Sequence, residues 1–226
     1  MAQVLATTLV VASLYALLGA GYVLVYRASR VLNLAQGDML TLGGYLLFAV
    51  ATSVGGGPAL AIPAAAALAA LTGFLIYLVL MRPMAGHPVF AAVLVTVTLG
   101  IQMRAAGERP LLASQRGIDF HRLFALSWAL AALAGALAGI LYSSNVRLEP
   151  SLDVLGLKAF AVALVGGLDS LGGVIPAAIL VAMIEVLSIR YGNPLLSDVS
   201  PFLCLLAMLL VRPWGLFGTK EELERV

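Results

Sequence analysis

Long apolar runs, separated by short polar or glycine-rich interruptions, dominate the chain. The first run covers residues 4–26, and two more follow at 39–54 and 59–81, with GGGP at 55–58 between them. As a helix, the first run reaches about 35 Å, which exceeds the hydrocarbon thickness of a bilayer, about 30 Å. The pattern predicts helices that cross a membrane.

The later apolar runs differ in length. Residues 123–142 predict a full span, whereas the runs at 89–102, 157–167, 174–187 and 203–211 are shorter. A helix over 89–102 would reach only about 21 Å. We therefore expect an all-α, polytopic transmembrane bundle in one domain, with about seven or eight apolar segments, some short or broken.

The composition agrees with a membrane-embedded chain. Apolar residues make up 62% and charged residues 11%, with a mean hydropathy of +1.06, whereas a soluble domain has about a quarter charged residues. The net charge of +2 is too small to indicate a nucleic-acid partner. The first run lacks a basic segment before it and is longer than the core of a signal peptide, so we expect a retained span.

Sites for metals, cofactors and catalysis are not expected. Cys204 is the single cysteine, and His87 and His121 are isolated, which argues against a disulfide and a metal site. The chain has no phosphate-binding G-x-x-x-x-G-K-[ST] motif and no nucleophile–base constellation. We expect a protein that is not an enzyme and carries no cofactor.

Arginines give an orientation with one conflict. Arg27 and Arg30 follow the first run and Arg82 closes the third, so both ends are expected in the cytoplasm. Residues 103–122 contain four arginines and should also be cytoplasmic. A single crossing by residues 88–102 would place Arg82 and this segment on opposite sides, unless residues 88–102 re-enter or lie at the interface.

Polar residues interrupt the apolar pattern in each half of the chain. Asn33, Gln36 and Gly37 share one helical face by their i, i+3, i+4 spacing, and polar groups at membrane depth tend to face a protein interior or a water-filled path. A lining role and simple helix packing both stay open. Glycine-rich breaks at 37–44 and 166–173 suggest discontinuous helices around a site between internal repeats. The candidate path residues are Asn33, Gln36, Gly37, Asp38, Gly166, Gly167, Asp169 and Ser170.

Two further features lie within apolar runs. Gly135 and Gly139 form a G-x-x-x-G motif, which favours a tight helix crossing. Lys158 and Glu185 are charged, and three interpretations stay open: either lines the path, the two pair, or each reaches an interface through its long side chain.

The ordered motifs resemble a known family. Residues 31–38 (VLNLAQGD), followed by GGY at 43–45, are similar to the first-half signature of the branched-chain amino acid ABC transporter permeases, with Gln36 replacing a histidine and Asp38 a glutamate. In the second half, GLKAF at 156–160, GGLDSLGG at 166–173, Glu185 and RPWGLFG at 212–218 resemble the closing signatures. The resemblance covers nearly the whole chain.

Residues 103–122 resemble the cytoplasmic coupling loop of that family, which seats in a groove of the ATP-hydrolysing subunit; an ordinary solvated loop is the alternative. Residues 1–102 would then be N-terminal helices and 123–226 C-terminal helices. Family members carry extra chain between the counterparts of Gln102 and Met103, so this chain resembles an internally shortened permease with one fewer crossing. The coupling residues implied are Arg104, Ala105, Glu108, Pro110, Gly117, Ile118 and Asp119.

The resemblance implies a permease subunit that imports branched-chain amino acids across the bacterial inner membrane as a multi-pass protein. Its implied partners are ATP-binding cassette ATPases, a second identical or related permease, an external substrate-binding protein and the lipid bilayer. The alternatives are a urea or amide importer, a shortened remnant or scaffold that binds the ATPase without transport, and an ATP-independent channel.

Overall fold

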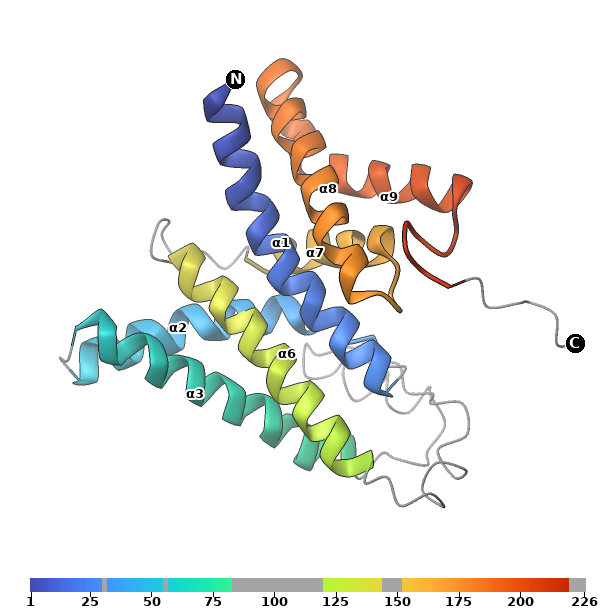
Figure 1. The fold of residues 1–226 in the computed structure, drawn as a ribbon. Helices are drawn as coiled ribbons and strands as arrows, with labels where there is room; N and C mark the ends of the chain where they lie inside the picture. Colours follow the sequence, from blue (N-terminus) through green and yellow to red (C-terminus); the bar gives the residue numbers. More distant parts are fainter. Residues whose placement is uncertain (30–31, 55–56, 83–119, 144–151, 220–226) are drawn as a thin grey trace, which may run out of the picture.

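The computed structural model describes residues 1–29, 32–54, 57–82, 120–143 and 152–219, and most of these are helical (Figure 1). The predicted all-α architecture is confirmed. The elements in chain order are α1 (Ala2–Ser29), α2 (Gln36–Val54), α3 (Pro58–Ile76), the π-helical turn η1 (Tyr77–Met81), α6 (Phe120–Ser143), α7 (Leu152–Gly166), α8 (Leu171–Tyr191), the 3₁₀ turn η3 (Pro194–Ser197) and α9 (Ser200–Val211).

Four of the described helices are long and apolar enough to cross a membrane. They cover Ala2–Ala28, Pro58–Val79, Phe124–Ser143 and Leu171–Tyr191. The first three match the spans predicted at residues 4–26, 59–81 and 123–142, and the fourth extends the run predicted at 174–187. The helices over Val154–Gly166 and Ser200–Val211 are apolar but shorter, as the sequence indicated. The chain is therefore a helical membrane protein.

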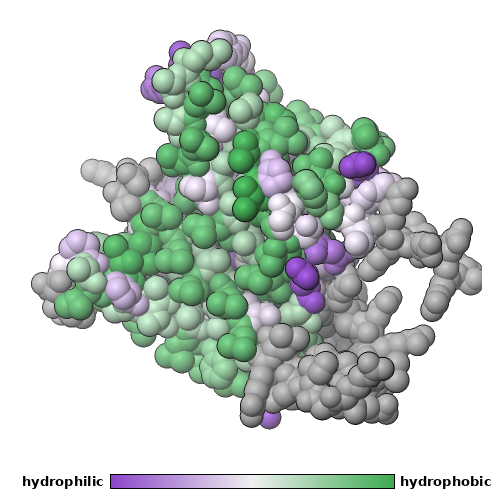
Figure 2. Space-filling view, viewed as in Figure 1, coloured by the Kyte–Doolittle hydropathy of each residue, from purple (hydrophilic) through white to green (hydrophobic). Residues whose placement is uncertain are grey.

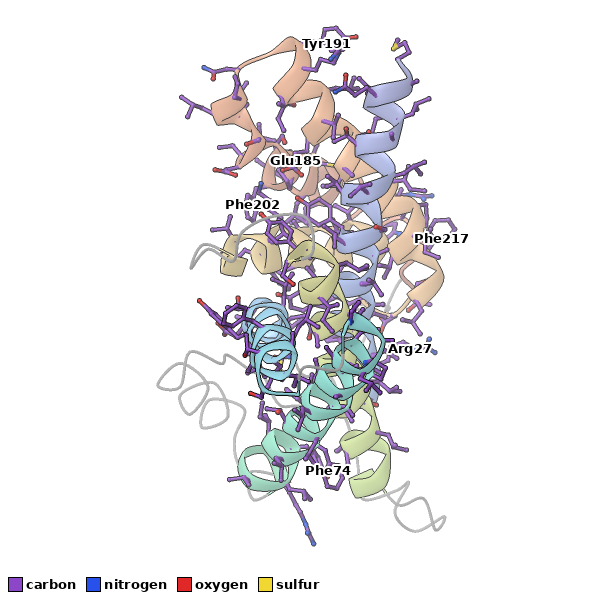
Figure 3. The ribbon with its side chains drawn as sticks, turned by 90° about the vertical axis from the view of Figure 1, so that its left-hand side faces the viewer. Arg27, Phe74, Glu185, Tyr191, Phe202 and Phe217 are labelled. Carbon is purple, nitrogen blue, oxygen red and sulfur yellow. The ribbon has the colours of Figure 1, made fainter. Side chains whose placement is uncertain are left out.

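Two central helices, α1 and α6, hold the other helices of the bundle together. Helix α6 packs against α1, α2 and α3, whereas α1 also packs against α7 and α8. Helices α1 and α8 lie side by side and run in opposite directions, so the N-terminus lies near Tyr191 (Figures 1 and 3). Apolar side chains cover most of the visible outer surface in Figure 2, as expected where lipid replaces water as solvent.

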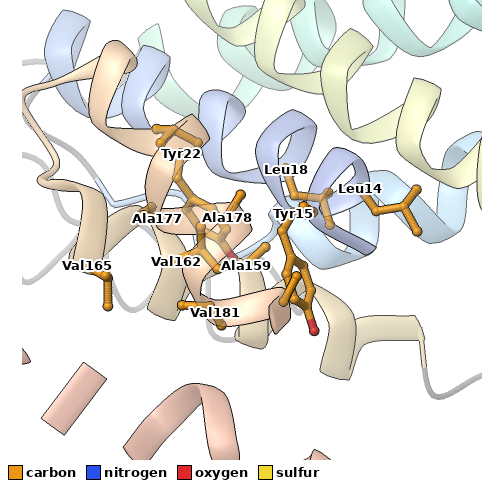
Figure 4. Packing of buried hydrophobic residues seen from close by; sticks show 14 of the residues in the cluster. Leu14, Tyr15, Leu18, Tyr22, Ala159, Val162, Val165, Ala177, Ala178 and Val181 are labelled. Carbon is orange, nitrogen blue, oxygen red and sulfur yellow. The ribbon is translucent and has the colours of Figure 1, made fainter. Parts of the chain in front are cut away.

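The larger core cluster lies between α1, α7 and α8 (Figure 4). Small side chains let these helices approach, and Tyr15, Leu18 and Tyr22 from α1 fill the remaining space between them. A smaller cluster forms around Trp128, where the start of α6 meets the end of α1 and η1. Both clusters fix α1 relative to its neighbours.

The predicted tight crossing of Gly135 and Gly139 is confirmed between α6 and α2. A Cβ atom on Gly139 would lie 2.0 Å from the Leu40 carbonyl oxygen, and one on Gly135 would lie 2.9 Å from the Met39 Cβ. On the facing helix, a Cβ on Gly43 would lie 2.3 Å from the Ala136 Cα. Since side chains are absent at these positions, the two backbones are in direct contact.

The predicted break at residues 37–44 is wrong. Helix α2 runs without interruption from Gln36 to Val54, so the non-helical stretch precedes Gln36. The glycines at 43 and 44 do not break the helix, because in lipid such residues allow close helix packing, and Gly43 does so against α6. The predicted break at 166–173 is confirmed between the end of α7 at Gly166 and the start of α8 at Leu171.

The predicted coupling loop lies largely outside the described residues. Its candidate residues, from Arg104 to Asp119, and the short run at 88–102 all belong to the range that the structure does not describe. Helix α6 begins at Phe120, so the last three residues of the predicted loop, 120–122, belong to a helix.

Candidate functional site

Asn33 and Gln36 form a buried amide pair at the corner between α1 and α2. Both side chains are buried, and Gln36 is 0% exposed. The Asn33 Nδ2 donates to Gln36 Oε1 over 3.1 Å, and Gln36 Nε2 donates to the Ala131 carbonyl on α6 over 2.8 Å. A Cβ on Gly21 would lie 2.1 Å from Gln36 Nε2, so a glycine on α1 makes the room. The pair ties α1, α2 and α6 together.

The next two candidate residues, Gly37 and Asp38, lie in different surroundings. Gly37 is buried against α7, where a Cβ on Gly156 would lie 2.3 Å from the Gly37 Cα. Asp38 is exposed in the first turn of α2. Of the four candidates in this half, Asp38 alone presents its side chain at the surface of the described chain.

The second-half candidates form the turn between α7 and α8. Gly167 has a φ of 98°, a left-handed conformation that favours glycine. Ser170 caps α8, because its Oγ accepts a hydrogen bond from the Gly173 N–H at 3.1 Å. Asp169 lies between these two residues and is half-buried. A polar cap and a glycine turn thus allow the reversal of direction.

The C-terminal motif at 212–218 packs onto this turn. The N–H of Leu216 donates to the Val165 carbonyl over 2.8 Å, and that of Phe217 donates to the Gly166 carbonyl over 3.1 Å. Two separate sequence motifs therefore form one structural unit.

The two sets of candidate residues contact α7 at different levels. Gly37 contacts α7 at Gly156, and the turn follows Gly166. Gly156 and Gly166 lie about 15 Å apart along the helix.

A buried charged cluster lies between α1, α7 and α8, in the region of Glu185 in Figure 3. Lys158 Nζ lies 2.7 Å from Glu185 Oε1, and the Tyr15 hydroxyl donates to Glu185 Oε2 over 2.5 Å. The Lys158 and Glu185 side chains are 7% and 9% exposed. Among the three interpretations left open for these two residues, the structure shows pairing.

Asp198 extends this cluster to the surface. Its Oδ1 lies 2.9 Å from Lys158 Nζ, while its side chain is 70% exposed. The hydrogen bond from Lys158 and the attraction of its ammonium lower the pKa of the Asp198 carboxyl below its ordinary value, so Asp198 is ionised at neutral pH. One ammonium therefore holds one buried and one accessible carboxylate.

Tyr15 and Asp198 were not among the site residues predicted from the sequence. A tyrosine inside an apolar span is a usable signal, because its buried hydroxyl needs a hydrogen-bond partner. Asp198 lies in a short polar interval between two apolar runs, but its pairing with Lys158 depends on how η3 packs against α8. Among the described residues, no three His, Cys, Asp or Glu side chains are grouped to hold a metal ion.

The chain is similar to known membrane transport proteins. The model of the family described as branched-chain amino acid transport system / permease component matches residues 4–102 and 88–211. The high-affinity branched-chain amino acid transport system permease protein LivH of Escherichia coli is 33% identical over 130 residues, which are 57% of this chain and 42% of that protein. BraD of Pseudomonas aeruginosa, a permease protein of the same description, is 32% identical over 133 residues, 57% of this chain and 42% of the relative.

A nucleoside ABC transporter permease protein, NupB of Lactococcus lactis, is also similar, with 35% identity over 102 residues, 43% of this chain and 28% of that protein. The aligned part of the chain thus spans about two fifths of the length of its LivH and BraD relatives. No solved structure matches. Because the family model covers most of its length, the chain belongs to the branched-chain amino acid transport system permease family.

Proposed function

We propose that the chain is a multi-pass permease subunit of an ABC importer that moves branched-chain amino acids across the bacterial inner membrane. The observation that carries this proposal is the family match, which extends from residue 4 to residue 211. The helical bundle with its four long apolar helices supports it, as does the similarity to LivH and BraD, which are permease proteins of branched-chain amino acid transport systems.

The proposed mechanism needs partners that supply energy and substrate. ATP-binding cassette ATPases would engage residues 103–119, with Arg104, Glu108 and Asp119 among the contacts. A second permease would complete the translocation path, and an external binding protein would deliver the solute. ATP binding can drive such a cycle only if the ATPase binds the two conformations of the permease with different affinities.

Helix α6 would carry movement from the coupling segment into the bundle. It follows that segment directly and packs against α1, α2 and α3. The Gln36 amide, bonded to the Ala131 carbonyl of α6, makes the α1–α2 corner move with α6 as one body. In this proposal Asn33, Gln36 and Gly37 support the path, and Asp38 faces it.

Cysteine labelling tests this division of roles. In a Cys204→Ala background, we expect Asp38→Cys to react with a membrane-impermeant maleimide, because its side chain is exposed. Gln36→Cys, two residues away and 0% exposed in its native form, should stay protected. Labelling of the full complex in liposomes measures both rates. Protection of Asp38→Cys as well as of Ser170→Cys would argue against a water-filled path here.

Reconstitution tests the function itself. We expect the chain, combined with its ATPase and binding protein in liposomes, to show leucine-stimulated ATP hydrolysis together with leucine uptake. Urea, small amides and nucleosides should be offered in parallel, since the NupB relative indicates a wider substrate range in such proteins. ATPase binding without uptake of any solute would favour a remnant or scaffold, and uptake without ATP would favour a channel.

A further inference from the structure

The Lys158–Asp198 contact differs from the Lys158–Glu185 contact in how readily it can be replaced. Glu185 is buried and also accepts the Tyr15 hydroxyl, so removing it would leave a buried ammonium with one partner fewer, which is costly. Asp198 is 70% exposed, and exposed ion pairs contribute little to stability. Glu185 is the fixed partner of Lys158, and Asp198 is the exchangeable one.

The charges of the cluster match an incoming solute with both signs. Two carboxylates and one ammonium leave a net charge of −1. A solute carboxylate that replaced Asp198 on Lys158 would free the Asp198 carboxylate, which then needs a cation. An ammonium group on the same solute supplies it. A simple anion on Lys158 would leave Asp198 unpaired. A simple cation on Asp198 would bring no carboxylate to replace Asp198 on Lys158.

The surroundings of Asp198 are apolar. Leu195, Leu196 and Val199 flank it and are all exposed. Asp198 itself lies between α8 and α9, outside the four long apolar helices. Charged groups beside exposed aliphatic side chains suit a zwitterion that carries an aliphatic side chain of its own.

The boundary between the start of α1 and the end of α8 also has room, although Lys158, Glu185, Asp198 and Tyr15 do not line it. Thr8 is buried and its Oγ1 lacks a hydrogen-bond partner among the described residues; it lies seven residues from Tyr15 and so on the same face of α1. A recess of about 300 Å³ opens between the two helices, at the lower end of the range for small-molecule sites. It is lined by Gln3, Val4, Thr7, Val186, Ile189 and Arg190.

We propose that Lys158 and Asp198 form a recognition site for a zwitterionic aliphatic amino acid. Without solute, the Asp198 carboxylate occupies the position beside Lys158 Nζ that the solute carboxylate takes on binding. The solute carboxylate binds Lys158 Nζ while Glu185 and Tyr15 keep that ammonium in place. Asp198 then accepts the solute ammonium. This inference deepens the proposed importer function and rests on it for the identity of the solute.

Three probes separate the two charges. L-leucine carries both, 4-methylpentanoate lacks the ammonium, and 3-methylbutylamine lacks the carboxylate. We expect the wild-type complex in nanodiscs to bind radiolabelled leucine and to be displaced poorly by either analogue. Asp198→Asn should weaken leucine binding roughly ten- to a hundredfold, the range for a hydrogen bond to a charged group, and should abolish the preference for leucine over 4-methylpentanoate.

Control variants separate the site from local structure. Asp198→Glu keeps the carboxylate and should restore the preference. Ser188→Ala, one turn beyond Glu185 on α8, removes a hydroxyl that bonds the Ile184 carbonyl and should leave leucine binding unchanged. The double variant Lys158→Met, Glu185→Leu removes the buried charges together and should abolish the preference for leucine over 3-methylbutylamine.

The outcomes distinguish the inference from the proposed function. Leucine uptake by wild type, with affinity and preference unchanged in Asp198→Asn, overturns the site and leaves the importer standing. Leucine binding that depends on Asp198 without any uptake supports the site and overturns the importer. Absence of both binding and uptake of leucine overturns both.

Discussion

Glu185→Leu is expected to destabilise the helical bundle by about 3 kcal/mol, the lower end of the range for removing one member of a buried ion pair. The substitution leaves the Lys158 ammonium paired with Asp198 and deprives the Tyr15 hydroxyl of its acceptor. The retained contact with Asp198 keeps the loss from being larger. Unfolding of the purified chain in mixed detergent micelles, followed by circular dichroism, measures the difference.

The double variant Lys158→Met, Glu185→Leu is the matched control. Replacing a whole buried pair with apolar residues of similar size is often neutral or stabilising, so the double variant should unfold close to wild type. The difference between the two variants is then the cost of an unpaired ammonium. If Glu185→Leu is as stable as the double variant, Lys158 reaches solvent without cost and the pair is not a buried one.

The helices could be predicted because the bilayer imposes a strong and local constraint. Residues 4–26 and 123–142 are mostly apolar and contain no charged residue, and a chain in lipid must satisfy its backbone hydrogen bonds internally, so helices were the expected outcome. The G-x-x-x-G motif at Gly135 was equally local, since small residues four positions apart already define a face. That α2 is the helix packed against this motif could be learned only from the structure.

The site was less predictable because its chemistry depends on contacts between distant residues. Tyr15 and Glu185 are 170 positions apart, and no spacing rule relates them. The spacing of Asn33 and Gln36 predicted a shared helical face, but Asn33 precedes α2, which begins at Gln36. Their side chains nevertheless bond to each other. Gln36 contacts α6 rather than an open surface. The sequence alone could not decide between lining a path and packing against a helix.

The glycines show the same limit. A Gly-Gly pair at 43–44 and another at 166–167 look alike in sequence, yet the first lies within a continuous helix and the second ends one. The second pair is followed by Asp169 and Ser170, and a serine that caps the next helix gives the chain a reason to turn. The first pair is followed by Tyr45, Leu46 and Leu47, none of which is a favoured N-cap residue.

Gly139→Ala is expected to destabilise the bundle by roughly 2–3 kcal/mol, the upper part of the range for adding atoms to a close-packed interior. The new Cβ would lie 2.0 Å from the Leu40 carbonyl oxygen and 2.9 Å from its carbon. These are backbone atoms inside α2, so no side-chain rotation relieves the clash and the two helices must separate. Separation also strains the neighbouring contact of Gly43 with Ala136.

Gly172→Ala is the matched control for the same chemical change. Gly172 is exposed in the first turn of α8, and a Cβ there would meet only the Ser170 Oγ, at 3.9 Å. Alanine also favours the helix over glycine by about 0.5–1 kcal/mol, so this variant should match or exceed wild-type stability. The midpoint of thermal unfolding in detergent compares the two variants. Equal midpoints would mean that α2 and α6 do not cross in contact at Gly139, and that the bundle is looser there than its backbone distances require.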